Sequence, residues 1–380
     1  MALFWVVSIT LQFMPHTSAA SLSSKDNTLH SVLADKVQMM QKDTQRLSIN
    51  RILNIRDFSF NSYIVVECDP IGYLIYHPSS AVVIESSPTS YSPYLGLTGQ
   101  DLVYCGPTEY YVKDGSKYTH TITGETITLE VDVERMELTS QRISNTLLGM
   151  KDLALLDYLS SGNPTAYATS KQANTGTRGG NLSWGEINWF KALTTCGYYS
   201  YTGDPNTTDD DYGCCGYVGL AILYGFFDRF VDTKYMPDQY WTTGAKTYLK
   251  SGDDSFTKYL HDLDPQSGTT SIHIKSVSEQ HLENSNITDI SHTSRVWGLF
   301  TANTIKGLLD DGYPVELFGA LEKPPEYNDT GKKKGHAVVA YQYTTTSETQ
   351  YICHYGWPGY TEVTIVGTLG SIYAMTLEQS

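Results

Sequence analysis

The stretch Gly213-Cys214-Cys215-Gly216 decides how this chain is interpreted, because it opens an apolar run that extends from Tyr217 to Phe227. That run is apolar nearly all round and long enough to form a buried helix. Cys215 would then lie in the first turn. A helix N-terminus and a nearby imidazolium both lower the pKa of a thiol, and the thiolate is the nucleophilic form. The pattern therefore predicts a candidate nucleophile at Cys215, although buried cysteines are more often inert.

A second stretch supplies a candidate base. Gly335-His336-Ala337-Val338-Val339 begins a run of strand formers, so His336 is predicted at the first position of a buried strand. His336 follows Cys215 by 121 residues (336 − 215), compatible with the roughly 130 to 150 residues between the cysteine and histidine of papain-type sites. Alone, such a histidine is more often a satisfied core residue than a base.

The next predicted strand, residues 350–357, ends in His354-Tyr355-Gly356-Trp357. A hairpin would bring His354 close to His336, from which it is 18 residues away (354 − 336), and a third group beside the base holds the imidazole in one tautomer. His354 is therefore the candidate orienting residue, with an ordinary strand histidine as the alternative. Trp357 is expected either to shield the catalytic hydrogen bond from water or simply to pack in the core.

Together these motifs resemble secreted bacterial cysteine peptidases of the papain fold, of the streptopain and staphopain kind. The Cys-Gly-x-x-small-Leu-Ala pattern corresponds to Cys215 through Ala221, the Gly-His-Ala-Val pattern to 335–338, and the Asn-Trp-Gly-Trp stretch to His354 through Trp357. The resemblance covers residues from Trp184 onward. It implies that Cys215 is the nucleophile, His336 the base and His354 the orienting residue, and that no cofactor or metal is needed.

Three positions depart from the family pattern. His354 stands where streptopain-like enzymes have Asn, and Asp209 stands where papain-like enzymes have the Gln that donates to the oxyanion. An ionised Asp cannot donate a hydrogen bond, so the alternatives are Asn206, Tyr212 or the backbone N–H of Cys215. Cys214 competes with Cys215 as nucleophile, and the family pattern favours Cys215.

Composition excludes some classes of partner. The chain has 380 residues, a net charge of −15 and a pI near 5.0. Nucleic acids and anionic membranes require basic patches, and the one basic cluster, Lys332-Lys333-Lys334, is expected to be a solvated loop. No Cys-x-x-Cys or His-Glu-x-x-His motif supports a metal site. We therefore expect protein or peptide substrates, and no nucleic-acid partner.

The N-terminus indicates secretion. Residues 1–20 contain an apolar core followed by small residues, with cleavage expected after Ala20, although no Lys or Arg precedes Lys25. The run is too short to span a membrane as a helix. We therefore expect an extracellular protein without a membrane anchor after signal removal.

Residues 21–115 are predicted to form a separate unit. Leu29, Val32, Leu33 and Val37 recur at helical spacing, and the helix is expected over 26–48 with Asp26 as its cap. Three β-rich runs then follow, separated by Pro- and Gly-containing turns, as in a meander: 62–68, 72–76 and 81–85. This unit resembles the inhibitory propeptide of streptopain-like enzymes; a permanent accessory domain is the alternative.

Residues 116–183 are expected to connect the two parts. The stretch 160–181 is rich in Gly, Ser and Thr and is predicted to be a linker, with Lys171 or Arg178 as cleavage points. Cys68 and Cys105 are a possible disulfide pair within the N-terminal unit.

The sequence thus predicts an α+β fold. A papain-like domain over 184–380, in which the nucleophile helix packs on an antiparallel barrel-like sheet, follows the propeptide-like unit. The expected function is that of a secreted cysteine endopeptidase made as a zymogen, with its own N-terminal region as inhibitor. The alternatives are a cell-wall Cys-His-His hydrolase, whose Cys and His usually lie closer in sequence, and an inactive papain-like module that binds peptides.

Overall fold

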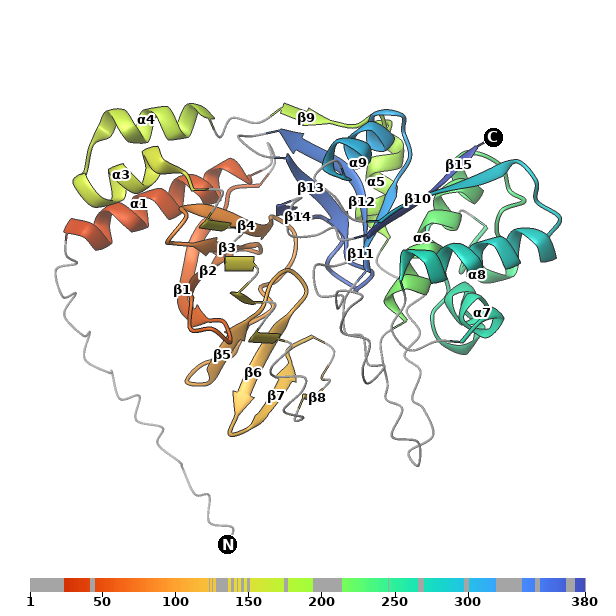
Figure 1. Cartoon of the computed structure of the whole chain (residues 1–380), viewed down its shortest axis with the longest axis horizontal. Coiled ribbons are helices and arrows are strands. Elements are labelled where there is room, and N and C mark those ends of the chain that lie inside the picture. The colour runs from red at the N-terminus through yellow and green to blue at the C-terminus, as the bar shows by residue number, and fades with distance from the viewer. Residues whose placement is uncertain are drawn as a thin grey trace, which may run out of the picture.

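The computed structural model describes residues 24–41, 45–122, 124, 126–127, 136–137, 140–141, 143–144, 147–148, 151–173, 177–193, 214–244, 246–265, 270–296, 301–318, 337–345, 349–366 and 373–379. These residues form a mixed α/β fold organised around one large sheet (Figure 1). Two parts of the chain build it, and we call them the N-terminal unit (described residues 24–127) and the C-terminal unit (described residues 177–379).

The N-terminal unit is one helix packed on a mostly antiparallel set of strands. Its elements are α1 (Ser24–Met39), β1 (Ser48–Arg56), β2 (Ser62–Asp69), β3 (Tyr73–His77), β4 (Val82–Ser87), β5 (Asp101–Tyr104), β6 (Tyr110–Asp114), β7 (Lys117–His120) and β8 (Thr126–Ile127). Successive strands from β1 to β4 pair antiparallel, which confirms the meander expected from the three β-rich runs.

The first helix is shorter than the sequence pattern predicted. α1 starts at Ser24 and ends at Met39, whereas the helix was expected to continue to residue 48, which is the first residue of β1. Val32, Leu33 and Val37 bury one side of α1 in the same apolar cluster as Ile64 and Val66 of β2. The predicted apolar face is therefore present, and the helix ends before the predicted position.

The segment predicted to be a linker contains regular structure. α3 (Leu153–Ser161) and α4 (Pro164–Ala173) form a helical pair, and β9 (Thr177–Gly179) adds to β12 of the C-terminal unit. The Tyr158 and Tyr167 rings stack with 4.4 Å between their centroids, so these two tyrosines provide an apolar contact between the helices. Gly162 ends α3 in the left-handed conformation.

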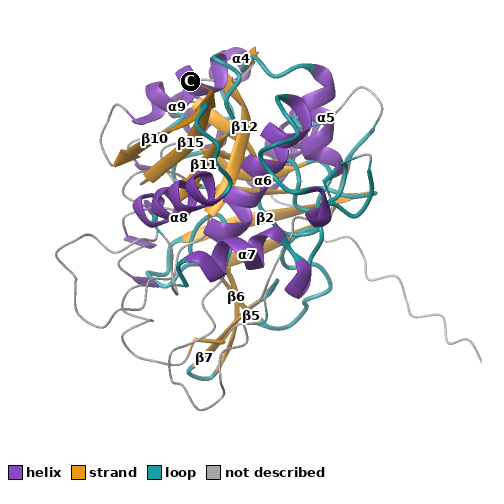
Figure 2. Ribbon diagram, turned by 90° about the vertical axis from the view of Figure 1, so that its right-hand side faces the viewer, coloured by secondary structure: helices purple, strands orange, loops and turns teal. Residues whose placement is uncertain are grey.

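The C-terminal unit places helices against the other end of the sheet. Its helices are α5 (Trp184–Ala192), α6 (Cys215–Phe230), α7 (Phe256–Leu263), α8 (Ser271–Asn284) and α9 (Thr301–Asp310), with short 3₁₀ turns η1 (Asp238–Tyr240) and η2 (Gly252–Asp254). Its strands are β10 (Ile290–Val296), β11 (Val315–Phe318), β12 (Ala337–Thr345), β13 (Thr349–His354), β14 (Val363–Val366) and β15 (Tyr373–Gln379). Figure 2 shows α6, α7 and α8 gathered beside these strands.

The sheet is continuous between the two units. Its order is β10-β15-β11-β12-β13-β14-β4-β3-β2-β1-β5-β6-β7-β8, and the junction is an antiparallel pairing of β14 with β4. The Ser87 hydroxyl reinforces this junction by donating to the carbonyl oxygen of Glu362 at 2.8 Å. One apolar cluster contains residues of both units, including Tyr73 and Ile84 together with Val338 and Val363. The two units therefore share a core.

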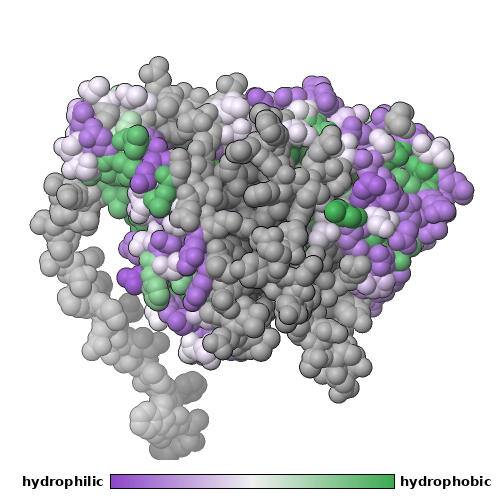
Figure 3. Space-filling model, in the orientation of Figure 1, coloured by the Kyte–Doolittle hydropathy of each residue, from purple (hydrophilic) through white to green (hydrophobic). Residues whose placement is uncertain are grey.

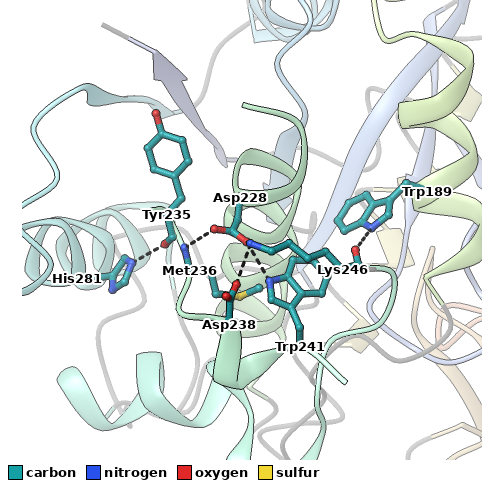
Figure 4. Close-up of polar contacts among 8 residues, drawn as sticks. All are labelled: Trp189, Asp228, Tyr235, Met236, Asp238, Trp241, Lys246 and His281. Atoms are coloured by element: carbon teal, nitrogen blue, oxygen red, sulfur yellow. Dashed lines mark hydrogen bonds and ion pairs between the residues drawn. The ribbon is translucent and has the colours of Figure 1, made fainter. Parts of the chain in front are cut away.

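Helix α6 lies at the centre of the C-terminal core, and every residue from Gly216 to Asp228 is buried. Its far end is anchored by Asp228, whose carboxylate accepts from the Met236 backbone at 3.1 Å, from Trp241 Nε1 at 2.9 Å and from Lys246 Nζ at 2.6 Å (Figure 4). Such a saturated buried carboxylate resists movement, because each donor would lose its partner. The network anchors the C-terminal end of α6 to the segment that follows it.

On the face shown in Figure 3, the residues that the structure describes are a mixture of hydrophilic and hydrophobic ones. Hydrophobic residues gather at the end of the molecule that carries α1, α3 and α4. Met39 of α1 and Leu153 of α3 are exposed. Among the described residues, no helix is both long and apolar enough to cross a membrane.

Candidate active site

Cys215 is the first residue of α6 and is half-buried. The backbone N–H groups of Ala337 and Gly216 donate hydrogen bonds to its sulfur. Ala337 is the first residue of β12, so the start of this strand lies directly against the start of the helix. The structure thus brings together the two sequence segments that carried the predicted nucleophile and base.

The thiol of Cys215 is in its neutral form in this arrangement. Burial is the main cause that raises its pKa, to about 12. The Ala337 and Gly216 N–H groups lower the pKa, but they do not offset the effect of burial, and the nearby Glu316 carboxyl raises it further. Desolvation disfavours the thiolate because the charge loses its hydration. A catalytic role would need an additional influence that stabilises the thiolate.

His336 lies outside the described residues, and its predicted role as base stays a prediction. The residue that follows it, Ala337, contacts Cys215 through its backbone. Asn206, Asp209 and the cluster 332–334 also lie outside the described residues, as does the predicted signal segment 1–20.

His354 is the last residue of β13 and is fully buried. Its Nε2 lies 2.8 Å from the carbonyl oxygen of Leu193, and the Gly356 backbone N–H donates to its Nδ1 at 2.9 Å. These partners select the tautomer with the proton on Nε2. Burial lowers the pKa of the ring to about 4, so the imidazole is neutral near pH 7. The predicted role of His354 as orienting residue stays a prediction.

The turn after His354 packs on α6. Gly356 has a φ of 78°, and a Cβ there would lie 3.0 Å from Cγ1 of Val218. A glycine is required by both the left-handed backbone and the close approach. The first turn of α6 is therefore enclosed by the start of β12 and the end of β13.

Trp357 is buried, and its ring contacts both units. The ring centroids of Trp357 and Tyr355 lie 5.9 Å apart, and those of Trp357 and His120 lie 5.7 Å apart. His120 ends β7 of the N-terminal unit. The predicted shielding residue is thus itself covered by the unit that was predicted to be inhibitory.

Glu316 was missed by sequence analysis. It lies on β11 with 0% of its surface exposed, and neither carboxyl oxygen has a hydrogen-bond partner among the residues that the structure describes. A Cβ on Gly219 would lie 2.2 Å from Glu316 Oε1, so the carboxyl group packs directly on α6, one turn after Cys215. The available signal was a single acid within the apolar run Pro314-Val315-Glu316-Leu317-Phe318.

Glu85 on β4 was also missed. Its carboxyl is fully buried and accepts hydrogen bonds from the hydroxyls of Tyr73, of Tyr110 at 2.5 Å and of Tyr104 at 3.4 Å. The hydroxyl of Tyr355, from the C-terminal unit, also stabilises the carboxylate. Burial outweighs these donors and raises the pKa of Glu85 to about 7. This cluster lies where the two units meet.

Other candidate chemistry is limited among the described residues. The described chain holds no group of three or more His, Cys, Asp or Glu side chains arranged to bind a metal ion. Cys68 and Cys105 belong to different apolar clusters and are not joined by a disulfide.

Comparison with known proteins gives little. No family model matches the chain, and no curated protein matches it. Among solved structures, a fragment of prointerpain A from Prevotella intermedia is similar, with a TM-score of 0.38 and 11% sequence identity, over 86% of this chain and 98% of that one.

Proposed function

We propose that this protein is a secreted cysteine peptidase with a papain-like C-terminal unit, made in a latent form. The observation that carries the proposal is the contact between the Cys215 sulfur and the backbone of Ala337, the residue directly after His336. Cys215 also begins a buried helix, where the partial positive charge of the N-terminus favours a thiolate.

In the proposed reaction the Cys215 thiolate attacks the carbonyl carbon of a peptide bond. The resulting oxyanion receives a hydrogen bond from the backbone N–H of Cys215 or from another donor nearby. His336 protonates the leaving amine, and water then attacks the acyl-enzyme to release the second product and restore the thiol. His354 and Trp357 would position and shield the base.

Two features of the site support the proposal that the peptidase is made in a latent form. The thiol is held neutral by burial, and the N-terminal unit packs on Trp357 through His120 and on Tyr355 through Glu85. We infer that the N-terminal unit acts as an inhibitor of the peptidase, and that its removal exposes the Cys215 region. A tethered inhibitor is effective because its local concentration is high.

A second candidate is a papain-like module that binds peptides without cutting them. The neutral Cys215 thiol and the engagement of both His354 ring nitrogens with backbone groups favour it. Under this candidate, the shared core of the two units is permanent and the N-terminal unit is an accessory domain.

The test is covalent labelling of the full chain with an epoxide inhibitor of papain-like enzymes, before and after limited proteolysis of the N-terminal unit. We expect mass spectrometry to find the adduct on Cys215 after proteolysis, and Cys215→Ala to lose both labelling and casein cleavage. The matched control is Cys214→Ala, which should keep both. An adduct on Cys214 would reassign the nucleophile, and no adduct after removal of the N-terminal unit would favour the binding module.

Secretion is part of the proposal and rests on residues 1–20. Expression with the full N-terminus in a secreting bacterial host should yield extracellular protein that begins at Ser21. Mature protein that retains residues 1–20, or that stays inside the cell, would contradict it.

A further inference from the structure

Glu316 is an unusual residue to find inside this core. Its directly paired neighbours are Val339 on β12 and Met375 on β15, both fully buried and apolar. Paired residues on neighbouring strands project to the same face of a sheet, so the carboxyl group is surrounded by these side chains and by α6. A buried polar group without a hydrogen-bond partner is destabilising, and a strand of this kind normally carries an apolar residue there.

The chain makes room for this carboxyl group. Gly219 stands opposite it on α6, and any larger residue would clash, because a Cβ would lie 2.2 Å from Oε1 and 2.6 Å from Cδ. Glycine is less favourable than alanine in the interior of a helix. Both the acid and the glycine that accommodates it therefore carry an energetic penalty, and that pairing calls for a functional explanation.

The carboxyl group lies on the helix face that carries Cys215. Residues four apart share one face of a helix, and one turn rises about 5.4 Å. Cys215 and Gly219 have this spacing, so the carboxyl is about one turn from the sulfur. Among the described elements that pack around Glu316, β12 and β15 present Val339 and Met375, and α6 presents Cys215 as the titratable group.

We propose that Glu316 is a positioning residue that controls when the Cys215 sulfur becomes a thiolate, an inference that rests on Cys215 being the nucleophile proposed above. When the Glu316 carboxyl is neutral, it does not repel the negative charge of the thiolate. When it ionises, two negative charges lie about one helical turn apart inside the core, and the thiolate becomes less favourable. For an effective dielectric constant of about 20, the fraction of thiolate falls on the order of a hundredfold.

Two further observations agree with this role. Burial raises the pKa of Glu316 well above its usual range, so the carboxyl is neutral under mildly acidic conditions and ionises only as the pH increases. The Glu316 carboxyl also raises the pKa of the Cys215 thiol. The carboxyl would then leave the reactivity of the thiol unchanged at mildly acidic pH. Once ionised, it would delay to higher pH the rise in reactivity that accompanies ionisation of the thiol.

The test follows the rate at which iodoacetamide alkylates Cys215 between pH 5 and pH 11, with the modified residue located by peptide mass spectrometry. The protein is the full chain, in which Cys215 is half-buried. We expect Glu316→Gln to increase the alkylation rate on the rising limb of the profile tenfold or more. The midpoint obtained by fitting that limb should then lie at least one unit lower in pH. Glu316→Met, which leaves no buried polar group, should shift it in the same direction.

The matched control is Asp228→Asn. It neutralises a buried carboxylate on the same helix, more than three turns from Cys215, and removes one of the two charge partners of Lys246. This variant should be less stable yet keep the wild-type midpoint, which separates general destabilisation from a local effect of charge. Circular dichroism of each variant shows that it is folded.

Folded Glu316→Gln and Glu316→Met with the wild-type midpoint would overturn the inference while leaving Cys215 as nucleophile. If Cys215 resisted both iodoacetamide and the epoxide in every variant, the proposed function would fail instead. A midpoint shift shared by Asp228→Asn would assign the effect to loosened packing and would also overturn the role of Glu316.

Discussion

Glu85 and Glu316 are both fully buried glutamates on strands of the same sheet, but their surroundings are opposite. Glu85, at the junction of the two units, accepts hydrogen bonds from three tyrosine hydroxyls. Glu316, beneath the helix that begins with Cys215, has no hydrogen-bond partner for either oxygen. In both cases burial raises the pKa, to about 7 for Glu85 and well above the usual range for Glu316.

The difference separates two uses of a buried acid. The donors around Glu85 come from several elements, so its carboxyl connects those elements. The hydrogen bonds from these donors also lower the pKa of Glu85 and offset part of the effect of burial. Glu316 makes no such connections, and its presence destabilises the core that surrounds it. We therefore expect substitutions at the two positions to change stability in opposite directions.

The largest effect is expected for Glu85→Leu. Tyr73, Tyr104 and Tyr110 would each lose their acceptor inside the core, and an unsatisfied buried donor costs about 1 to 3 kcal/mol. We expect the free energy of unfolding, measured with urea, to fall by about 4 kcal/mol. Tyr104→Phe, which removes only the 3.4 Å bond, should cost less than about 1 kcal/mol. Equal losses for the two variants would show that the cluster does not act as a unit.

Glu85 also predicts a pH dependence. Its pKa is raised from 4.5 to about 7 in the folded protein, so its contribution to stability is fully present below pH 4.5 and is lost as the pH rises toward 7. The shift of 2.5 units corresponds to about 3 kcal/mol. We expect the stability difference between wild type and Glu85→Gln to decrease by about that amount between pH 4.5 and pH 7. A difference that stays constant would mean that folding does not raise the pKa of Glu85.

His354 provides a case in which the partners are backbone groups. His354→Ala would leave the Leu193 carbonyl oxygen and the Gly356 N–H without their partner, at a cost of about 2 to 3 kcal/mol. His354→Asn retains one donor and one acceptor and should lose less. Thermal unfolding of both variants measures the contribution of the His354 side chain to stability. A loss of casein cleavage in His354→Asn at unchanged stability would assign His354 a part in catalysis.

The smallest effect is expected for Glu316→Met. Removing the unpartnered carboxyl should increase the free energy of unfolding by about 1 to 2 kcal/mol, because desolvation of the polar group no longer opposes folding. Urea unfolding at pH 7 measures the change. A loss of stability in this variant would mean that the carboxyl has a partner, and the contrast with Glu85 would disappear.

Local elements were largely predictable from the sequence. The helix after Cys214, the strands that follow Ser62 and Ala81, and the hairpin of β12 with β13 all form where apolar periodicity and turn residues indicated. These features depend on neighbours within a few residues, which a sequence pattern records directly. The helical pair α3 and α4 was not predicted, because the Gly, Ser and Thr content of residues 160–181 indicated a linker. Its packing depends on Leu155, which is buried in the apolar cluster that α1 and β2 also form.

The amino-acid pattern alone was sufficient to predict that Cys215 begins a buried helix and that the strand after His336 pairs with the strand that ends at His354. The pattern did not predict that the two units share one sheet through β4 and β14, or that Glu85 and Glu316 are buried in opposite surroundings. The difference arises from the distance along the chain over which each effect acts. Hydrophobic periodicity acts over a few residues, whereas strand pairing and the desolvation of a carboxyl group depend on elements that are far apart in the chain.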